Sequence, residues 1–495
     1  MLKAAKGGVL TSESRRLECA DKRRRQPERA DKLTRGDRTL GTFFRFSERG
    51  TNLRTEVVAG LTTFMTMAYI IFVNPAILGT EGTGLSVPGV FFATCVAAAV
   101  ACIAMGLVAN FPLALASGLG LNAIVAFTLI LGQGLSWQQA MAVIVVEGLL
   151  VTFLVLTNLR EAVLNAIPLS LKFAIAVGIG LFIAFIGLKN AGLVVPNPDT
   201  YLALGDLTQG PVLLAAFGLI VTLALVARGL KGGIIIGIFI TGIVGMIFGV
   251  VPPPSGIVDF GFDTSTVGGG VLAVPQVLQL SLLPVIFALF MTDFFDTMGT
   301  MFAVAQEGKL LDEEGRVPQA RRILLVDSLA AVLGGGMGAS SVTSYIESGS
   351  GVAEGGRTGM TSVVVGLLFL LALPFSPLIS VFGGSLPIPD PTGGNDPLFV
   401  SPVTAPALIV VGFLMMTAVR LIPWERFDEA IPAFLTILTL PLTFNISYGI
   451  GFGFISYVLI KLSRGRAGEV HPLLYGAAVL FALAFVWPAL QGLLS

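Results

Sequence analysis

The stretch NFPLALASGLGLN, residues 110–122, decides how the surrounding chain must fold. It begins with a proline-containing extended run of small residues and then opens a short helix, and long apolar runs flank it. A second stretch of this kind, GGGMGASSVTSYIESGSG, occupies residues 334–351. Non-helical backbone at membrane depth survives only where it is buried in protein or lines a cavity. Both stretches therefore predict an interior that holds polar backbone away from lipid.

The composition excludes a soluble protein. Hydrophobic residues make up 54% of the 495 residues, charged residues only 12%, and the mean hydropathy is +0.88, whereas soluble domains carry about 25% charged residues. Residues 1–54 have a net charge of +8, and the remainder has a net charge of −8. A soluble enzyme and a nucleic-acid binder built on the long C-terminal body are both excluded. The chain is predicted to be an all-α polytopic membrane protein.

Apolar runs long enough to cross a bilayer core of about 30 Å divide the chain into two halves. We predict about fourteen spans, at 56–78, 88–109, 119–132, 137–158, 168–189, 211–228, 231–250, 280–305, 321–334, 345–355, 358–382, 402–420, 428–443 and 446–463. The predicted organisation is a basic tail (1–54), a first repeat of spans 1–7 (55–250), a second repeat of spans 8–14 (279–463) and a C-terminal apolar segment (464–495). Within that segment, residues 472–493 form either a fifteenth crossing or a helix packed outside the bundle.

The two interrupted stretches occupy spans 3 and 10, which are matching places in the two halves. Because seven spans is an odd number, the second repeat is predicted to be inserted upside down. Paired interrupted spans are the best sequence indication of a transporter site at an inverted-repeat interface. The alternative is close helix packing through small residues.

Lysine and arginine are sorted between the connections. The connections near 79–87, 133–136, 190–210, 251–279 and 383–401 contain neither residue, while the alternate connections and the N-terminal tail are basic. Positive charge marks the cytoplasmic side of a membrane protein, so the N-terminus is predicted to be cytoplasmic. Lys189 is the exception to this pattern.

A few ionisable side chains fall inside the predicted spans. Asp293 and Asp296 are three residues apart in span 8, which places both on one helical face. Glu347 begins the short helix of span 10, and Asn122 holds the equivalent position in span 3. A charge in the bilayer costs at least ~2.5–3.5 kcal/mol, and carboxyls in such surroundings readily hold a proton. These residues are the predicted site, and a structural polar clamp between helices is the alternative.

Other charged residues are predicted to be structural. Glu147 in span 4 and Asp327 in span 9 each stand alone, and either could bond a backbone amide that an interrupted stretch exposes. Glu354 and Arg357 flank the cytoplasmic end of span 10 and are predicted to pair.

Enzyme and metal chemistry have few candidate residues. The chain contains three cysteines and one histidine, His471, with no CxxC or Cys/His cluster. A zinc or disulfide framework and a Ser-His-Asp site are therefore disfavoured. We expect no metal, no cofactor, no nucleic-acid partner and no enzymatic activity.

Several motifs resemble the nucleobase–cation symporter-2 family, in particular its AzgA-like purine permeases. They are TEVVAGLTTFMTMAYIIFVNP (55–75), DFFDTMG (293–299), TSYIES (343–348) and GVAEGGRTG (351–359). The resemblance runs from about Phe43 to the C-terminus, and residues 1–42 have no counterpart in it. This chain departs from the family pattern at Ser117, where proline is frequent, and at Ile124, where an aromatic residue is frequent.

The resemblance implies two inverted repeats of seven spans, with spans 1–4 and 8–11 as a core domain and spans 5–7 and 12–14 as a gate domain. It also implies purine uptake coupled to protons. By motif position, Asp293, Glu347 and Asn122 should bind the base, and Asp296 with Asp293 should carry the coupling proton.

The expected activity is therefore import of guanine, hypoxanthine or adenine across the plasma or inner membrane by proton symport with elevator-like alternating access. We expect a homodimer formed through the gate domains. The preferred purine and the use of sodium in place of protons stay open. The alternative is an anion or carboxylate transporter of the same fold, which would favour helix N-termini and an arginine over buried acids.

Overall fold

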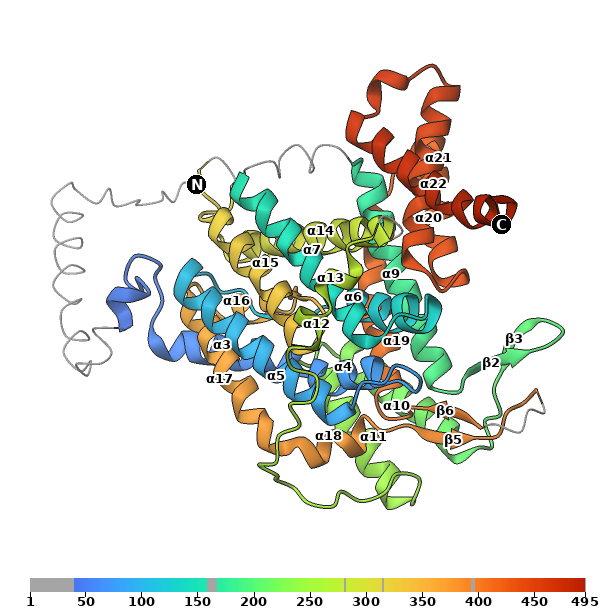
Figure 1. Ribbon diagram of the computed structural model, residues 1–495. Helices are drawn as coiled ribbons and strands as arrows, with labels where there is room; N and C mark the ends of the chain where they lie inside the picture. Colours follow the sequence, from blue (N-terminus) through green and yellow to red (C-terminus); the bar gives the residue numbers. More distant parts are fainter. Residues whose placement is uncertain (1–39, 158–166, 280–281, 314–315, 393–396, 495) are drawn as a thin grey trace, which may run out of the picture.

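The computed structural model describes residues 40–157, 167–279, 282–313, 316–392 and 397–494, and they are mostly helical (Figure 1). The elements before residue 250 are α3 (Leu53–Met67), α4 (Ile70–Leu78), α5 (Val87–Ala104), β1 (Leu115–Ser117), α6 (Leu119–Ala123), α7 (Trp137–Thr157), α9 (Leu169–Asn190), β2 (Val194–Asn197), β3 (Tyr201–Leu204), α10 (Gly210–Ala227) and α11 (Gly233–Ile247). The later elements are α12 (Gly269–Leu272), α13 (Val274–Val277), α14 (Leu283–Glu307), α15 (Ala320–Met337), β4 (Val342–Ser344), α16 (Ser348–Ala353), α17 (Gly359–Ala372), α18 (Ser376–Phe382), β5 (Leu386–Ile388), β6 (Leu398–Val400), α19 (Ala405–Met416), α20 (Phe427–Leu442), α21 (Ile446–Ser463) and α22 (Pro472–Leu494).

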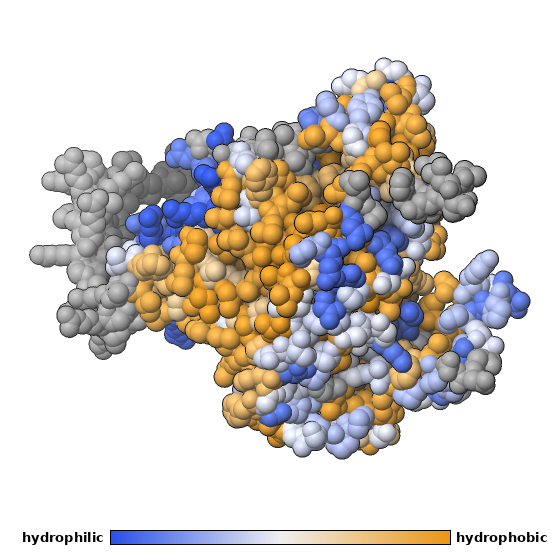
Figure 2. Space-filling model, in the orientation of Figure 1, coloured by the Kyte–Doolittle hydropathy of each residue, from blue (hydrophilic) through white to orange (hydrophobic). Residues whose placement is uncertain are grey.

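Every apolar run that predicts a span contains helix in the structure. Eight helical segments among the described residues are long and apolar enough to cross a membrane by themselves, and shorter apolar helices accompany them. The first predicted span is divided into α3 and α4, which meet at Ala68 and Tyr69. Large hydrophobic side chains are also widely exposed, and Figure 2 shows a broad hydrophobic surface on the face in view. Such a surface indicates contact with lipid.

Capping side chains mark where several helices begin. The Asn52, Ser86, Thr358 and Asn445 side chains each accept a hydrogen bond from a backbone N–H in the first turn of α3, α5, α17 and α21, respectively. These bonds satisfy donors that the first turn leaves without a partner. The polar residues between apolar runs therefore set the helix boundaries.

The two halves of the chain are interleaved. Helices α5 and α17 pack together, as do α7 and α15, and α9 packs against α19 and α20. Glycines permit the closest approaches: a Cβ on Gly148 of α7 would lie 2.8 Å from the backbone nitrogen of Val332 in α15. Each half therefore completes the packing of the other.

The connections group as their charge predicts. On the side without lysine or arginine, Ser86 Oγ donates to Asp263 Oδ2 at 2.5 Å, and the Ser401 N–H donates to the Asn190 carbonyl at 2.7 Å. The Ser86 hydrogen bond lowers the pKa of Asp263. On the basic side, Lys231 pairs with Glu354. The exceptional Lys189 lies at the end of α9, above the rings of Phe127 and Phe444.

A buried ionic cluster ties the end of α21 to the start of α20. Lys461 Nζ lies 2.6 Å from Asp428 Oδ2 and 3.0 Å from Glu469 Oε2, and the lysine side chain is only 1% exposed. Arg466 also contacts both acids. Hydrogen bonds from Lys461 and Arg466 lower the pKa of Glu469.

The C-terminal apolar segment forms α22, which packs mainly on α21 and also touches α14. The structure shows that this segment is helical and contacts the bundle, and both a fifteenth crossing and an outer helix are compatible with that contact.

Candidate functional site

The two interrupted stretches meet each other as a pair of short strands. β1 and β4 are antiparallel, with Leu115 opposite Ser344 and Ser117 opposite Val342. All six strand residues are buried. Beyond the strands, the Gly118 N–H donates to the Ser341 carbonyl at 2.9 Å, and the Tyr345 N–H donates to the Ala114 carbonyl at 2.9 Å. The pairing satisfies the backbone groups that leaving the helix exposes.

Asn122 lies in α6, directly after β1, and is fully buried. Its Oδ1 accepts a hydrogen bond of 2.8 Å from Ser117 Oγ, and the same hydroxyl contacts the Ala339 carbonyl. The Asn122 Nδ2 atom is buried without a hydrogen-bond partner. Ser117, which replaces a frequent proline of the family, therefore orients Asn122 with its amide donor available to a ligand.

Asp293 and Asp296 both lie on α14 but in different surroundings. Asp293 is fully buried; Ser341 Oγ approaches its Oδ1 at 3.5 Å, and its Oδ2 has no hydrogen-bond partner. Asp296 is exposed, one turn further along the helix. The shared helical face thus places one acid in the interior and the other at an accessible position.

Glu347 lies between β4 and α16 and is partly buried. Tyr69 donates its hydroxyl to Glu347 Oε1 at 2.5 Å. Helix α14 contacts α6, β4 and α16. Asn122, Asp293 and Glu347 therefore come from three elements that meet around the β1–β4 pair.

Glu147 and Asp327 belong to the same neighbourhood, so the prediction that each stands alone is wrong. Asp327 accepts hydrogen bonds from Thr297 Oγ1 at 2.7 Å and from Ser344 Oγ at 2.6 Å. Ser344 lies in the interrupted stretch, so Asp327 does support that stretch. The Glu147 carboxyl is fully buried, has no hydrogen-bond donor, and interacts with both Asp293 and Asp327. The sequence signal that could have indicated a place near Asp293 is that Glu147 lies deep within the predicted span 4.

The predicted pair of Glu354 and Arg357 does not form. Glu354 pairs with Lys231, while Arg357 Nη1 donates to the carbonyls of Val352 and Gly356. The start of α17 is instead held by Glu56, whose buried carboxylate accepts from the N–H groups of residues 357, 358 and 361 and from the hydroxyl of residue 361. A carboxylate at a helix N-terminus is favourable because the helix dipole is positive there.

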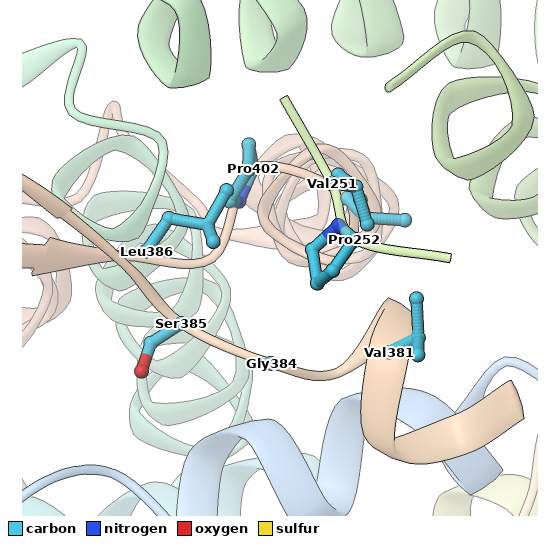
Figure 3. Close-up of a pocket in the computed structure, with 8 residues that line it drawn as sticks. Val251, Pro252, Val381, Gly384, Ser385, Leu386 and Pro402 are labelled. Carbon is cyan, nitrogen blue, oxygen red and sulfur yellow. The ribbon is translucent and has the colours of Figure 1, made fainter. Parts of the chain in front are cut away.

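A detected cavity of about 240 Å³ lies elsewhere, between the end of α18 and the strand β5 (Figure 3). Val251, Val381 and Leu386 line it together with prolines, and Ser385 supplies its only polar side chain. It has no titratable lining residue, so we place the candidate site beside the β1–β4 pair, on elements that carry the buried, unpaired atoms Asn122 Nδ2 and Asp293 Oδ2. No group of His, Cys, Asp or Glu side chains among the described residues is arranged to hold a metal ion.

Comparison with known families identifies the family to which this chain belongs. The family model described as "Permease family" matches residues 54–452. This chain belongs to that family. The predicted membership of the nucleobase–cation symporter-2 family is thereby confirmed.

Curated members of the permease family match nearly the whole chain. The guanine/hypoxanthine permease PbuG of Bacillus subtilis (strain 168) is 44% identical over 456 residues, covering 90% of this chain and 100% of its own. The adenine permease AdeQ of Escherichia coli (strain K12) is 40% identical over 460 residues, covering 93% of this chain and 99% of its own. Nucleobase permeases are thus the relatives of this multi-pass membrane protein.

Solved structures support the same fold at low sequence identity. The transmembrane domain of the cyanobacterial bicarbonate transporter BicA superposes with a TM-score of 0.56 and 14% identity, covering 80% of this chain and 97% of its own. The murine anion transporter Slc26a9 in its inward-facing state gives a TM-score of 0.59 and 12% identity, covering 94% and 77%. These similarities show that the chain shares the helical fold of these two proteins.

Proposed function

We propose that this permease imports purine nucleobases by proton symport. The observation that carries the proposal is that an amide donor, Asn122 Nδ2, and a carboxylate acceptor, Asp293 Oδ2, are both buried and unpaired on α6 and α14, which contact each other beside the β1–β4 pair. A ligand that supplies both a donor and an acceptor would satisfy both atoms. Relatives that are named guanine/hypoxanthine and adenine permeases support this class of substrate.

The edge of a purine matches these groups. Its ring N–H and amino groups are donors that carboxylates accept, while its ring nitrogens and exocyclic oxygen accept from an amide. Asp293 and Glu347 are the proposed acceptors and Asn122 the proposed donor. Because a buried polar group that loses its partner costs about 1–3 kcal/mol, the site should reject bases that leave one of these groups unpaired.

The coupling ion in this proposal is a proton carried by Asp296 together with Asp293. Asp296 lies one turn from Asp293 on α14, and its side chain is accessible in the folded chain, so in this proposal it exchanges the proton next to the substrate. Among the described residues, no lysine or arginine forms an ion pair with either acid, so neither charge is permanently neutralised. No metal or organic cofactor takes part, and sodium is the alternative coupling ion.

The proposed architecture has about fourteen spans, in repeats at 55–250 and 279–463. Spans 1–4 and 8–11 form a core that carries the site and moves past a gate made of spans 5–7 and 12–14, as an elevator. In this arrangement the N-terminal tail (1–54) is cytoplasmic, the C-terminal segment (464–495) flanks the bundle, and the gate domains join two chains in the cell membrane. Helix α7 packs on α15, both in the proposed core, and α9 packs on α19, both in the proposed gate, so these contacts are compatible with the division into core and gate.

Anion transport is the competing function, because the solved structures of this fold include a bicarbonate transporter and an anion transporter. The buried acid Asp293 argues against it, since a carboxylate beside the site repels an anionic substrate.

Uptake assays in cells that lack purine permeases test the proposal. Labelled hypoxanthine should accumulate, unlabelled guanine or adenine should compete, and uracil and bicarbonate should not. A protonophore should abolish accumulation in sodium-free medium. Uptake that survives the protonophore but requires sodium would reject proton coupling, and absence of purine uptake at normal surface expression would reject the substrate.

A further inference from the structure

We propose that Glu147 shares a proton with Asp293 and keeps that proton when Asp293 binds substrate as a carboxylate. This inference deepens the proposed function and rests on it. It assigns a coupling role to a residue in α7 that the sequence places among the structural acids.

The first observation is that three carboxyl oxygens on two packed helices are buried without hydrogen-bond donors. Both Glu147 oxygens and Asp293 Oδ2 are buried and unpaired; the two residues lie on α7 and α14, which pack against each other, and their carboxyls interact. An ionised carboxylate can only accept hydrogen bonds. Two carboxyls can therefore bond each other only if one of them holds a proton.

The second observation is that Glu147 has little freedom to move away. The neighbouring Gly148 brings α7 against the backbone of α15, where any Cβ would contact Val332 and Ser328. One turn later, Thr152 Oγ1 bonds Ser328 Oγ at 3.0 Å. The contact of α7 with α15 thus holds the Glu147 carboxyl next to α14.

The third observation is the charge that surrounds the pair. Asp327 on α15 faces Glu147 and is already bonded by Thr297 and Ser344. Asp296 on α14 interacts with Asp293 and also with Glu347, whose carboxyl accepts a hydrogen bond from Tyr69. Among the described residues, the charged groups that interact with the pair are all acids, so a proton is the positive charge that these groups leave to the pair.

These contacts define the order of events. Without substrate, Asp293 and Glu147 share one proton that comes from solvent. When a purine N–H donates to Asp293, the proton stays on Glu147, and the site carries one proton with one base. No covalent bond forms or breaks, and the charge of the site changes only by the proton that it gains or releases.

The test compares Glu147→Gln with Glu56→Gln. Both change a fully buried glutamate in the core of the protein, but the Glu56 carboxylate is bonded by several donors, whereas that of Glu147 has none. A glutamine at 147 imitates the protonated acid and can donate its amide to Asp293. The parent, both variants and Asp293→Asn are purified, and purine affinity, exchange and gradient-driven accumulation are measured in proteoliposomes.

We expect the affinity of the parent for hypoxanthine to fall as the pH rises through the titration of the pair, by up to about tenfold per pH unit. Glu147→Gln should bind and exchange purine at all these pH values but should not accumulate it against a gradient. Glu56→Gln should keep the pH dependence of the parent and lose thermal stability. Parental pH dependence together with gradient-driven accumulation in Glu147→Gln would overturn the inference.

Infrared difference spectra of the unliganded protein provide a readout that needs no purine. The absorption of a protonated carboxyl should be present in the parent at neutral pH and be lost in both Glu147→Gln and Asp293→Asn, because each amide lets the remaining acid ionise. Persistence of the full band in Glu147→Gln would overturn the shared proton even if that variant did not transport. Failure of the parent to transport purines, with the band behaving as expected, would reject the proposed function alone.

Discussion

Tyr69 and Glu347, 278 residues apart in the chain, are joined by a 2.5 Å hydrogen bond from the tyrosine hydroxyl to Oε1 of the glutamate. Tyr69 stands at the break between α3 and α4 and is only 1% exposed. A carboxylate has about four lone-pair sites, so this bond fixes the orientation of Glu347 and leaves further acceptor capacity for a ligand. The first helical segment thereby positions a candidate binding residue in the second half of the chain.

Replacing Tyr69 by phenylalanine should weaken purine binding without unfolding the protein. The lost hydrogen bond is worth about 1 kcal/mol, or about fivefold in affinity, because Glu347 must then be oriented by the ligand. Tyr448→Phe, on an exposed part of α21, is the control. In titrations of purified protein, the effects of Tyr69→Phe and Glu347→Gln should be less than additive; strict additivity would mean that Tyr69 does not act through Glu347.

Asp293→Asn and Glu347→Gln should lower purine affinity while thermal stability holds or improves. Each substitution is nearly isosteric; Glu347→Gln removes a charge that is costly in a membrane, and Asp293→Asn leaves the pair with Glu147 no more charged than in the parent. An amide presents an NH2 donor where the carboxylate presents its second acceptor oxygen, so one ring N–H is left unpaired, which costs ~1–3 kcal/mol, or about five- to 150-fold in affinity. Purine affinity and melting temperature are both measured for each purified variant and compared with those of the parent. Parental affinity in Asp293→Asn would exclude that residue from the binding site.

Asp296→Asn should impair transport more than binding. Asp296 is exposed next to the buried Asp293, a position suited to carrying a proton rather than to enclosing a base. Counterflow and proton-driven accumulation in proteoliposomes should fall, whereas affinity should stay within about threefold of the parent, less than the cost of a full hydrogen bond. Equal losses of binding and transport would instead assign Asp296 to the base.

The parts of the fold that depend on local sequence were predictable. Apolar runs correspond to helices because a helix satisfies its own backbone within lipid, and proline and small residues before Asn122 indicated where the helix would be interrupted. The pairing of β1 with β4 was not predictable, since Ser117 and Val342 are brought together only by the packing of both halves.

The candidate site, like the fold, was predictable only in part from the sequence. Asp293 and Glu347 stood out because charge is rare within apolar runs, but the sequence could not show that Glu147 lies beside Asp293. Glu354 was misassigned to Arg357 for a related reason. Closeness in sequence suggested that pair, whereas tertiary packing brings Lys231 to Glu354 and turns Arg357 towards backbone carbonyls.

Lys461→Met should destabilise the fold at the cluster that joins α20 and α21. The substitution leaves Asp428 buried with only arginine partners and removes one bond from Glu469; breaking a buried pair costs about 3–5 kcal/mol, and the remaining arginines favour the lower end. Arg464→Gln, at a side chain that is 52% exposed, should have little effect on the melting temperature.

The pH dependence of stability tests the same cluster. The pKa of Glu469 is lowered in the folded protein, so its contribution is present above the ordinary glutamate pKa and is lost as the pH falls through the lowered value. The melting temperature of the parent should therefore fall more on acidification than that of Lys461→Met, and equal slopes would contradict this account.

Removing residues 1–38 should leave transport and surface expression unchanged, whereas Arg49→Gln should reduce expression or stability. The family match begins at residue 54, and the described part of the segment before it contains a contact that joins two distant parts of the chain. Arg49 Nη1 donates to the carbonyl of Asn110 at 2.9 Å and to that of Arg357 at 2.7 Å, so it joins the start of the interrupted stretch 110–122 to the start of α17. Its charge makes each bond worth about 1.5–3 kcal/mol.

Arg45→Gln is the matched control, because Arg45 is 60% exposed and contacts only Glu48 among the ion pairs of the described residues. Labelled purine uptake, normalised to surface protein, decides between the two segments: loss of uptake on removing 1–38 would place an essential contact in the tail, and parental behaviour of Arg49→Gln would show that the bonds to Asn110 and Arg357 do not hold the interrupted stretch in place.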